Sequence, residues 1–202
     1  CLENAVERDP YSAEALLALG VSYVNELDHR RAFKYLNNWV THNPNYAGLE
    51  TMKSTDATDD TAADTNGGDE GALYQLKSLL NQAKDYDELN GNVENSVDVL
   101  EALGVVCNVT REFEEGAEYF RTATRLRPDD YQLFNKLGAT LANSSRSNEA
   151  QDAYQRALAI KPKYARAWLN MAISHSNLQN HDEAARCYLQ ALSLNPGAVH
   201  VW

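Results

Sequence analysis

Eight polar side chains of the sequence could bind a peptide, because their types and spacing suit them to that chemistry. Six are asparagines, whose amide carries a hydrogen-bond donor and an acceptor and so matches the N–H and C=O groups of a peptide unit. Two are cations, which make charge-assisted hydrogen bonds to a carboxylate. This chemistry implies an extended peptide with a free C-terminal carboxylate. The candidate peptide-binding residues are Asn25, Asn108, Asn135, Lys136, Asn143, Arg166, Asn170 and Asn177.

A repeat of 34 residues provides the elements that must position these side chains. Three prolines, Pro128, Pro162 and Pro196, keep this spacing, and a large–small apolar pair, a small residue and an aromatic residue recur in the same phase. This is the tetratricopeptide pattern, in which two helices, A and B, pack closely and a proline ends helix B. The repeats begin at Ala13, Val97, Tyr131 and Ala165. We therefore expect an all-α protein, a right-handed superhelix (α-solenoid) of stacked repeats with a concave groove.

All eight candidate residues fall in helix A, on the side away from its core. On a helical wheel, repeat positions 2, 5, 6, 9, 12 and 13 span an arc of about 120° opposite core positions 4, 7, 8 and 11. In a stacked solenoid that arc lines the concave groove. Position 9 is apolar or small in every repeat, which leaves room for an apolar ligand side chain; its occupants are Val21, Val105, Ala139 and Ile173.

Other roles stay open for single members of this set. Asparagine commonly caps or turns a chain at a helix end. Three members lie close to the end of helix A: Asn25, Asn143 and Asn177. Asn170 occupies a position where asparagine is frequent in generic repeats, and Lys136 and Arg166 could each be solvated.

The domain organisation follows the repeats. Residues 1–12 resemble the tail of a preceding repeat, and 13–46 form the first complete one. The register breaks in the section 47–96, which we expect to be a degenerate repeat or hinge between two arrays. Its segment 53–71 has no large apolar side chain and is expected to be a disordered loop. Further repeats cover 97–130, 131–164 and 165–202, the last with the start of another helix.

The sequence offers no pattern for catalysis, a cofactor or a metal. The five histidines are scattered, and His175 falls in core position 11. Glycine-rich phosphate loops, GxSxG turns and HExxH helices do not occur. Three widely spaced cysteines without a CxxC pair favour a reduced compartment. A formal net charge of −11 argues against nucleic acid and would steer basic partners toward the chain, or it only solvates the surface.

Several local sequences also resemble a known family. The stretch NKLGATLAN at Asn135–Asn143 with Tyr131 before it, and the blocks GVSYVNE at Gly20–Glu26 and NWVTHNPNYAGL at Asn38–Leu49, closely resemble the receptor for the type-1 peroxisomal targeting signal. The resemblance covers most of the chain. Because the chain lacks an initiator Met and opens with Cys1 inside a helical pattern, we interpret it as a fragment of a longer protein.

The resemblance implies a function. Members of this family bind cargo proteins that end in Ser-Lys-Leu or a close variant, which is a receptor-read address. In the family, groove asparagines hold the cargo backbone and carboxylate, and by motif these correspond to the six asparagines above, with the two cations near the carboxylate end. It also implies cycling from the cytoplasm to peroxisomal or glycosomal membranes, where docking proteins bind a missing N-terminal half. The alternative is a tetratricopeptide co-chaperone or scaffold that binds another C-terminal peptide, or a regulatory array cut from an enzyme.

Overall fold

The computed structural model describes residues 9–26, 28–46, 68–92 and 96–195, and the side chains of Asn25 and residues 68–70 lie outside that description. Every regular element among the described residues is a helix, as the sequence predicts. The chain divides into two compact units, Cys1–Thr110 (unit 1) and Arg111–Trp202 (unit 2). This division falls inside the repeat expected at 97–130, between its two helices, and each unit is described by itself.

Unit 1 contains four described α-helices and a short 3₁₀-helix. They are α2 (Ala13–Asn25), α3 (His29–His42), η1 (Pro44–Tyr46), α4 (Gly68–Asn90) and α5 (Ser96–Val109). The side chains of Ser12 and Asp28 cap α2 and α3 by accepting a backbone N–H of the first turn. Helix α3 packs against α2 and α4, and α5 packs against α4 and α2.

The middle section contributes one long helix to unit 1. Helix α4 spans 23 residues and begins at Gly68, so the last four residues of the expected loop 53–71 are helical, and that part of the prediction is wrong. The rest of the expected loop lies outside the described residues. Buried leucines of α4, Leu76, Leu79 and Leu80, explain the long helix, because they attach it to the core. The helix ends before Gly91, whose φ of 68° requires the left-handed region that glycine adopts without strain.

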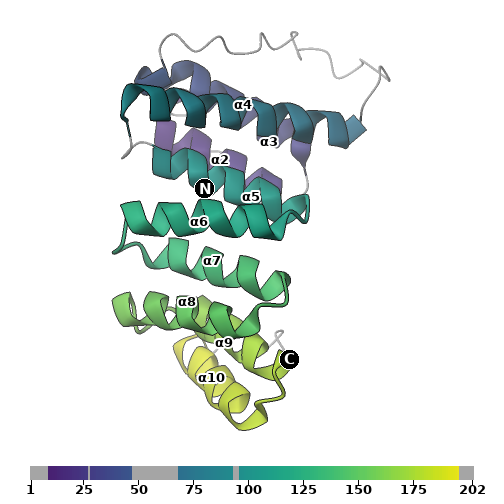
Figure 1. Cartoon of the computed structure of the whole chain (residues 1–202), viewed down its shortest axis with the longest axis vertical. Helices are drawn as coiled ribbons and strands as arrows, with labels where there is room; N and C mark the ends of the chain where they lie inside the picture. Colours follow the sequence, from purple (N-terminus) through teal and green to yellow (C-terminus); the bar gives the residue numbers. More distant parts are fainter. Residues whose placement is uncertain (1–8, 27, 47–67, 93–95, 196–202) are drawn as a thin grey trace. The chain divides into compact units, whose positions relative to one another are not determined.

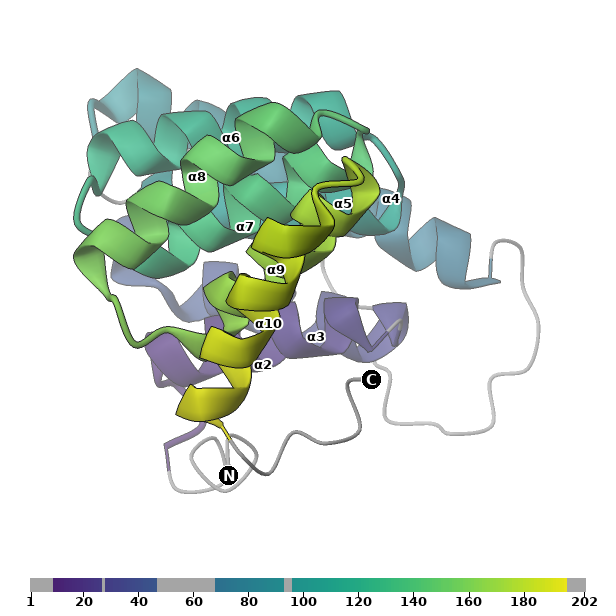
Figure 2. The same cartoon turned by 90° about the horizontal axis from the view of Figure 1, so that it is seen from below.

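Unit 2 follows the repeat register closely. Its helices are α6 (Phe113–Leu126), α7 (Tyr131–Asn143), α8 (Ser147–Ile160), α9 (Ala165–Asn177) and α10 (His181–Leu194). Each packs against the next, and the ribbon shows them as a stack of antiparallel helices (Figure 1). The final pair, α9 and α10, lies side by side in the orthogonal view (Figure 2). Helices α7 and α9 begin at the residues where the sequence places the starts of their repeats.

Close approach of α7 and α8 depends on a glycine opposite an aromatic ring. A Cβ atom at Gly138 would lie 2.5 Å from Cε1 of Tyr154, well inside van der Waals contact. The ring of Tyr154 is almost fully buried, so it has little space in which to move. One repeat later the equivalent pair is Ala172 and the half-buried Tyr188, so the slot tolerates a methyl group where the ring is less enclosed.

Candidate functional site

The centre of the candidate site is a pair of amides from successive repeats. Nδ2 of Asn170, in α9, donates a 3.0 Å hydrogen bond to Oδ1 of Asn135, in α7. Asn135 is only 6% exposed, whereas Asn170 is half-buried. The helical wheel predicted both on the face that lines a groove, but the structure buries Asn135 and leaves only its partner Asn170 partly exposed. The pair therefore has a structural role that the sequence did not reveal.

Two cations accompany this pair on neighbouring positions of the same helices. Lys136 follows Asn135 in α7 and is half-buried, and Arg166 is the exposed second residue of α9. The charge of Arg166 acts on the ring beside it: burial raises the pKa of Tyr164, and the positive charge of Arg166 opposes that rise. This part of unit 2 therefore combines amide groups with positive charge, which suits it to a peptide carboxylate.

Asn143 and Asn177 end helices α7 and α9, and both are exposed. Backbone groups cap these helices: Ser144 N–H donates to the carbonyl of Thr140, and Leu178 N–H donates to that of Ser174. Within the described part of the chain, neither asparagine side chain makes a hydrogen bond. The side chains of Asn143 and Asn177 therefore do not cap their helices, which was the alternative role for these two residues. Both side chains are exposed to solvent.

The two remaining candidates belong to unit 1, and the position-9 residues are divided between the two units. Asn108 is half-buried in α5. Asn25 is the last residue of α2, and its side chain is not among those that the structure describes. At position 9, Val21 and Val105 are buried in unit 1, Ala139 is half-buried, and Ile173 is 43% exposed. Six of the eight candidates thus belong to unit 2, where Asn135 and Asn170 contact each other directly.

A further polar cluster was not predicted from the sequence. Nζ of Lys161, at the end of α8, donates a 2.9 Å hydrogen bond to the hydroxyl of Tyr131 and lies 4.3 Å from the centre of that ring. Tyr131 and Tyr164 meet edge to face with ring centres 4.8 Å apart. Hydrogen bonds from Gln132 and Lys161 lower the pKa of Tyr131. The signal available in the sequence was the absence of any Asp or Glu between residues 153 and 181.

Comparison with protein families identifies the repeat. Tetratricopeptide repeat families match residues 109–165 and 165–197. The PEX5-related protein of Mus musculus is 37% identical over 148 residues, which is 73% of this chain and 25% of that protein. The peroxisomal targeting signal receptor of Candida albicans is 36% identical over 155 residues, 76% of this chain and 24% of the receptor. The chain thus spans about a quarter of the length of these curated relatives.

Solved structures agree on the fold. The crystal structure of MamA superposes with a TM-score of 0.58 at 16% identity, over 98% of this chain and 87% of MamA. The first TPR of Spaghetti (RPAP3), bound to the HSP90 peptide SRMEEVD, superposes with a TM-score of 0.51 at 18% identity, over 54% of this chain and 86% of that one. The predicted all-α tetratricopeptide solenoid is therefore confirmed. In the part of the chain that the structure describes, no helix is long and apolar enough to cross a membrane.

Proposed function

Because the chain belongs to the tetratricopeptide-repeat family of the peroxisomal targeting signal receptors and PEX5-related proteins, we propose that it binds the C-terminal Ser-Lys-Leu-type tripeptide of cargo proteins. The proposed ligand-binding residues are the eight of the sequence analysis: Asn25, Asn108, Asn135, Lys136, Asn143, Arg166, Asn170 and Asn177. The chain acts by binding, and no catalytic step is involved.

The observation that carries the proposal is the hydrogen-bonded pair Asn135–Asn170. Its amides come from successive repeats, so an extended peptide that crosses α7 and α9 meets one after the other. A peptide unit presents both an N–H and a C=O group, and each asparagine amide can satisfy either. The hydrogen bond holds Asn170 in place before the ligand arrives, which lowers the entropy that binding must remove.

The charged residues give the proposed site its preference for a chain terminus. Lys136 and Arg166 lie on the same two helices as the amide pair and supply donors for a terminal carboxylate. Hydrogen bonds to a charged group contribute about 1.5–3 kcal/mol each, more than those between neutral groups. The carboxylate is therefore the part of the ligand whose removal costs most.

For the full-length protein we propose the wider role that the names of its relatives describe. It would recognise cargo in the cytoplasm, carry it to the membrane of peroxisomes or related organelles such as glycosomes, and meet docking proteins there. Docking would use a part of the protein outside this chain, since the chain matches only about a quarter of its relatives.

Fluorescence anisotropy tests the proposal on this chain. A labelled peptide ending in Ser-Lys-Leu is titrated beside its C-terminally amidated twin, and we expect amidation to weaken binding by roughly tenfold to a hundredfold. Equal affinity for the two peptides would contradict the proposal. The peptide SRMEEVD serves as the comparison for a co-chaperone function, because the first TPR of RPAP3 binds it. Tighter binding of SRMEEVD than of the Ser-Lys-Leu peptide would favour that alternative.

A further inference from the structure

Charge is distributed unevenly along this acidic chain. Unit 1 has 7 Lys and Arg against 19 Asp and Glu, a net charge of −12, whereas unit 2 has 11 against 10, a net charge of +1. Within unit 2 the segment 153–181 contains no acidic residue. Its four basic residues, Arg156, Lys161, Lys163 and Arg166, form what we call the basic patch.

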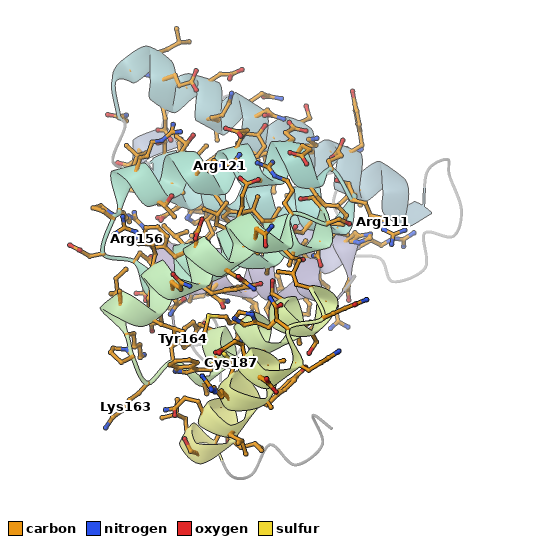
Figure 3. All side chains as sticks on the ribbon, turned by 60° about the horizontal axis from the view of Figure 1, so that its bottom comes forward. Arg111, Arg121, Arg156, Lys163, Tyr164 and Cys187 are labelled. Carbon is orange, nitrogen blue, oxygen red and sulfur yellow. The ribbon has the colours of Figure 1, made fainter. Side chains whose placement is uncertain are left out.

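The basic patch surrounds the turn from α8 to α9. All four side chains are exposed, and none of them makes an ion pair within the described residues. Two arginines elsewhere in unit 2 are ion-paired: Arg146 pairs with Glu114 at 2.6 Å, and Arg121 pairs with Glu149 at 3.0 Å. Figure 3 shows Arg156, Tyr164 and Lys163 along the same edge, with Lys163 projecting away from the ribbon. The basic patch therefore keeps its charge available for a ligand.

A rigid aromatic base supports this turn. Lys161 lies 4.3 Å from the ring centre of Tyr131 and 5.8 Å from that of Tyr164, and it donates to the Tyr131 hydroxyl. Nε1 of Trp168 donates a 2.9 Å hydrogen bond to the carbonyl of Pro162, within the turn itself. These contacts join the start of α7, the end of α8 and the start of α9. A turn fixed in this way holds its cations at set positions and loses little entropy when it binds.

We propose that the basic patch is a docking surface for an acidic polypeptide segment, whose Asp and Glu side chains pair with its lysines and arginines. Guanidinium and ammonium groups are natural partners of carboxylates. A short acidic segment meets only the local positive field, whereas a long polyanion would also meet the charge of −11 on the whole chain. An anionic membrane is less suited, because Ile160, 38% exposed, is the one exposed large apolar side chain that adjoins the patch among the described residues.

This inference goes beyond the proposed function: the basic patch shares Arg166 with the tripeptide site, but its ligand groups are side-chain carboxylates and not a chain terminus. A suitable probe is a labelled peptide of alternating Glu and Gly, acetylated and amidated at its ends, beside a twin with Gln in place of Glu. At low salt we expect the acidic peptide to bind at least about tenfold more tightly than its twin, and added salt to weaken it. Equal binding of the two peptides would overturn the proposal.

Charge-reversal variants locate the binding. In R156E/K163E both substituted side chains are exposed and make no hydrogen bond or ion pair within the described residues, so the fold should be kept. We expect this variant to bind the acidic peptide about tenfold more weakly. The control R125E/R186E changes the net charge equally at exposed sites of α6 and α10, where Arg186 also loses its 3.0 Å ion pair with Glu183, and it should still have a much smaller effect on binding of the acidic peptide. Equal weakening in both variants would show a general field effect and overturn the proposal.

Two further measurements distinguish the basic patch from the tripeptide site and from a lipid-binding surface. Binding of R156E/K163E to the Ser-Lys-Leu peptide should stay at the wild-type level, so a failure of the tripeptide function and a failure of this proposal give different results. Vesicles of phosphatidylcholine with phosphatidylserine test a lipid surface. If such vesicles bind the wild-type chain in a patch-dependent way and the acidic peptide does not, the proposal is wrong.

Discussion

Unit 1 buries a carboxyl group in its interior, whereas unit 2 joins a buried amide to a half-buried one. In unit 1 the carboxyl of Asp87 is fully buried and accepts a 3.0 Å hydrogen bond from the hydroxyl of Tyr46, and its other oxygen has no partner among the described residues. Desolvation raises the pKa of Asp87. In unit 2 the two groups are neutral, and Asn135 accepts its hydrogen bond from the next repeat.

The difference separates a structural contact from the binding surface that we propose. Asp87 belongs to the long helix α4, where the repeat register breaks, and its bond to Tyr46 attaches α4 to η1. The rings of Trp39 and Tyr86 pack edge to face around Tyr46, which leaves no room for a ligand. Asn135 and Asn170 lie in helices that keep the repeat register, on the helix face that the sequence predicts to line a groove. A neutral amide can be buried at lower cost than a carboxylate and still exchange partners.

The largest expected effect tests how strongly the burial of an aromatic ring sets stability within unit 2, where the same repeat slot is fully buried in one repeat and half-buried in the next. We expect Tyr154→Ala to destabilise unit 2 by about 3–5 kcal/mol, because it removes a buried ring that fills the space beside Gly138. The matched control, Tyr188→Ala, removes the half-buried ring of the next repeat and should cost clearly less. Urea unfolding gives the free energy of unfolding of both variants, and hydrogen exchange shows which helices lose protection. Equal losses for the two variants would contradict the difference in burial.

The second prediction concerns the amide pair itself. We expect Asn170→Ala to weaken the Ser-Lys-Leu peptide by about 1–3 kcal/mol, because a ligand group loses its partner. Asn135→Ala should do the same, and both substitutions should also lower the free energy of unfolding by about 0.5–1.5 kcal/mol, since each removes one partner of the hydrogen bond between the two amides. Anisotropy and urea unfolding of both single variants and the double variant measure the coupling between the two amides. Full binding with reduced stability would show that the pair only holds α7 and α9 together.

The repeat pattern predicted the fold well, but it did not predict the surroundings of the candidate site residues. The starts at Ala13, Tyr131 and Ala165 were predicted to the residue, because several slots agree in phase across repeats. The helical start of α4 was missed, since composition alone assigned its first turn to a loop. The burial of Asn135 and the stacking of Lys161 on Tyr131 depend on contacts between residues 30 or more positions apart. A wheel drawn for one helix cannot include such neighbours.

The third prediction tests the buried carboxyl of unit 1. Tyr46→Phe should destabilise unit 1 by about 1–3 kcal/mol, because Asp87 keeps its burial and loses its donor. The control is Tyr35→Phe, a half-buried ring that stacks on Tyr23. If both substitutions have an equal and small effect on urea unfolding, the hydroxyl of Tyr46 does not stabilise the buried carboxyl of Asp87.

The pH dependence of unit 1 gives a second measurement on the same group. Because the pKa of Asp87 is raised in the folded state, the folded unit binds a proton more readily than the unfolded chain. Its stabilising contribution is full below the ordinary carboxyl pKa and is lost as pH rises through the raised value. Asp87→Asn should remove this part of the slope of stability against pH. If the slope of stability against pH is unchanged in Asp87→Asn, another group is responsible for this pH dependence.

The smallest expected effect is a gain in stability at the turns within the repeats of unit 2. Arg111, Ser145 and Gln179 are 34 residues apart and all have φ between 61° and 64°, a region that glycine adopts without strain. Ser145→Gly relieves strain at one of these turns but increases the entropy of the unfolded chain, so we expect a net gain of only about 0.5 kcal/mol. Ser144→Gly is the control, because its φ of −86° carries no such strain and the hydroxyl of Ser144 donates to the carbonyl of Leu141. We expect that control to lose stability in urea unfolding. A loss at Ser145 as large as that at Ser144 would mean that the left-handed turn adds no measurable strain to unit 2.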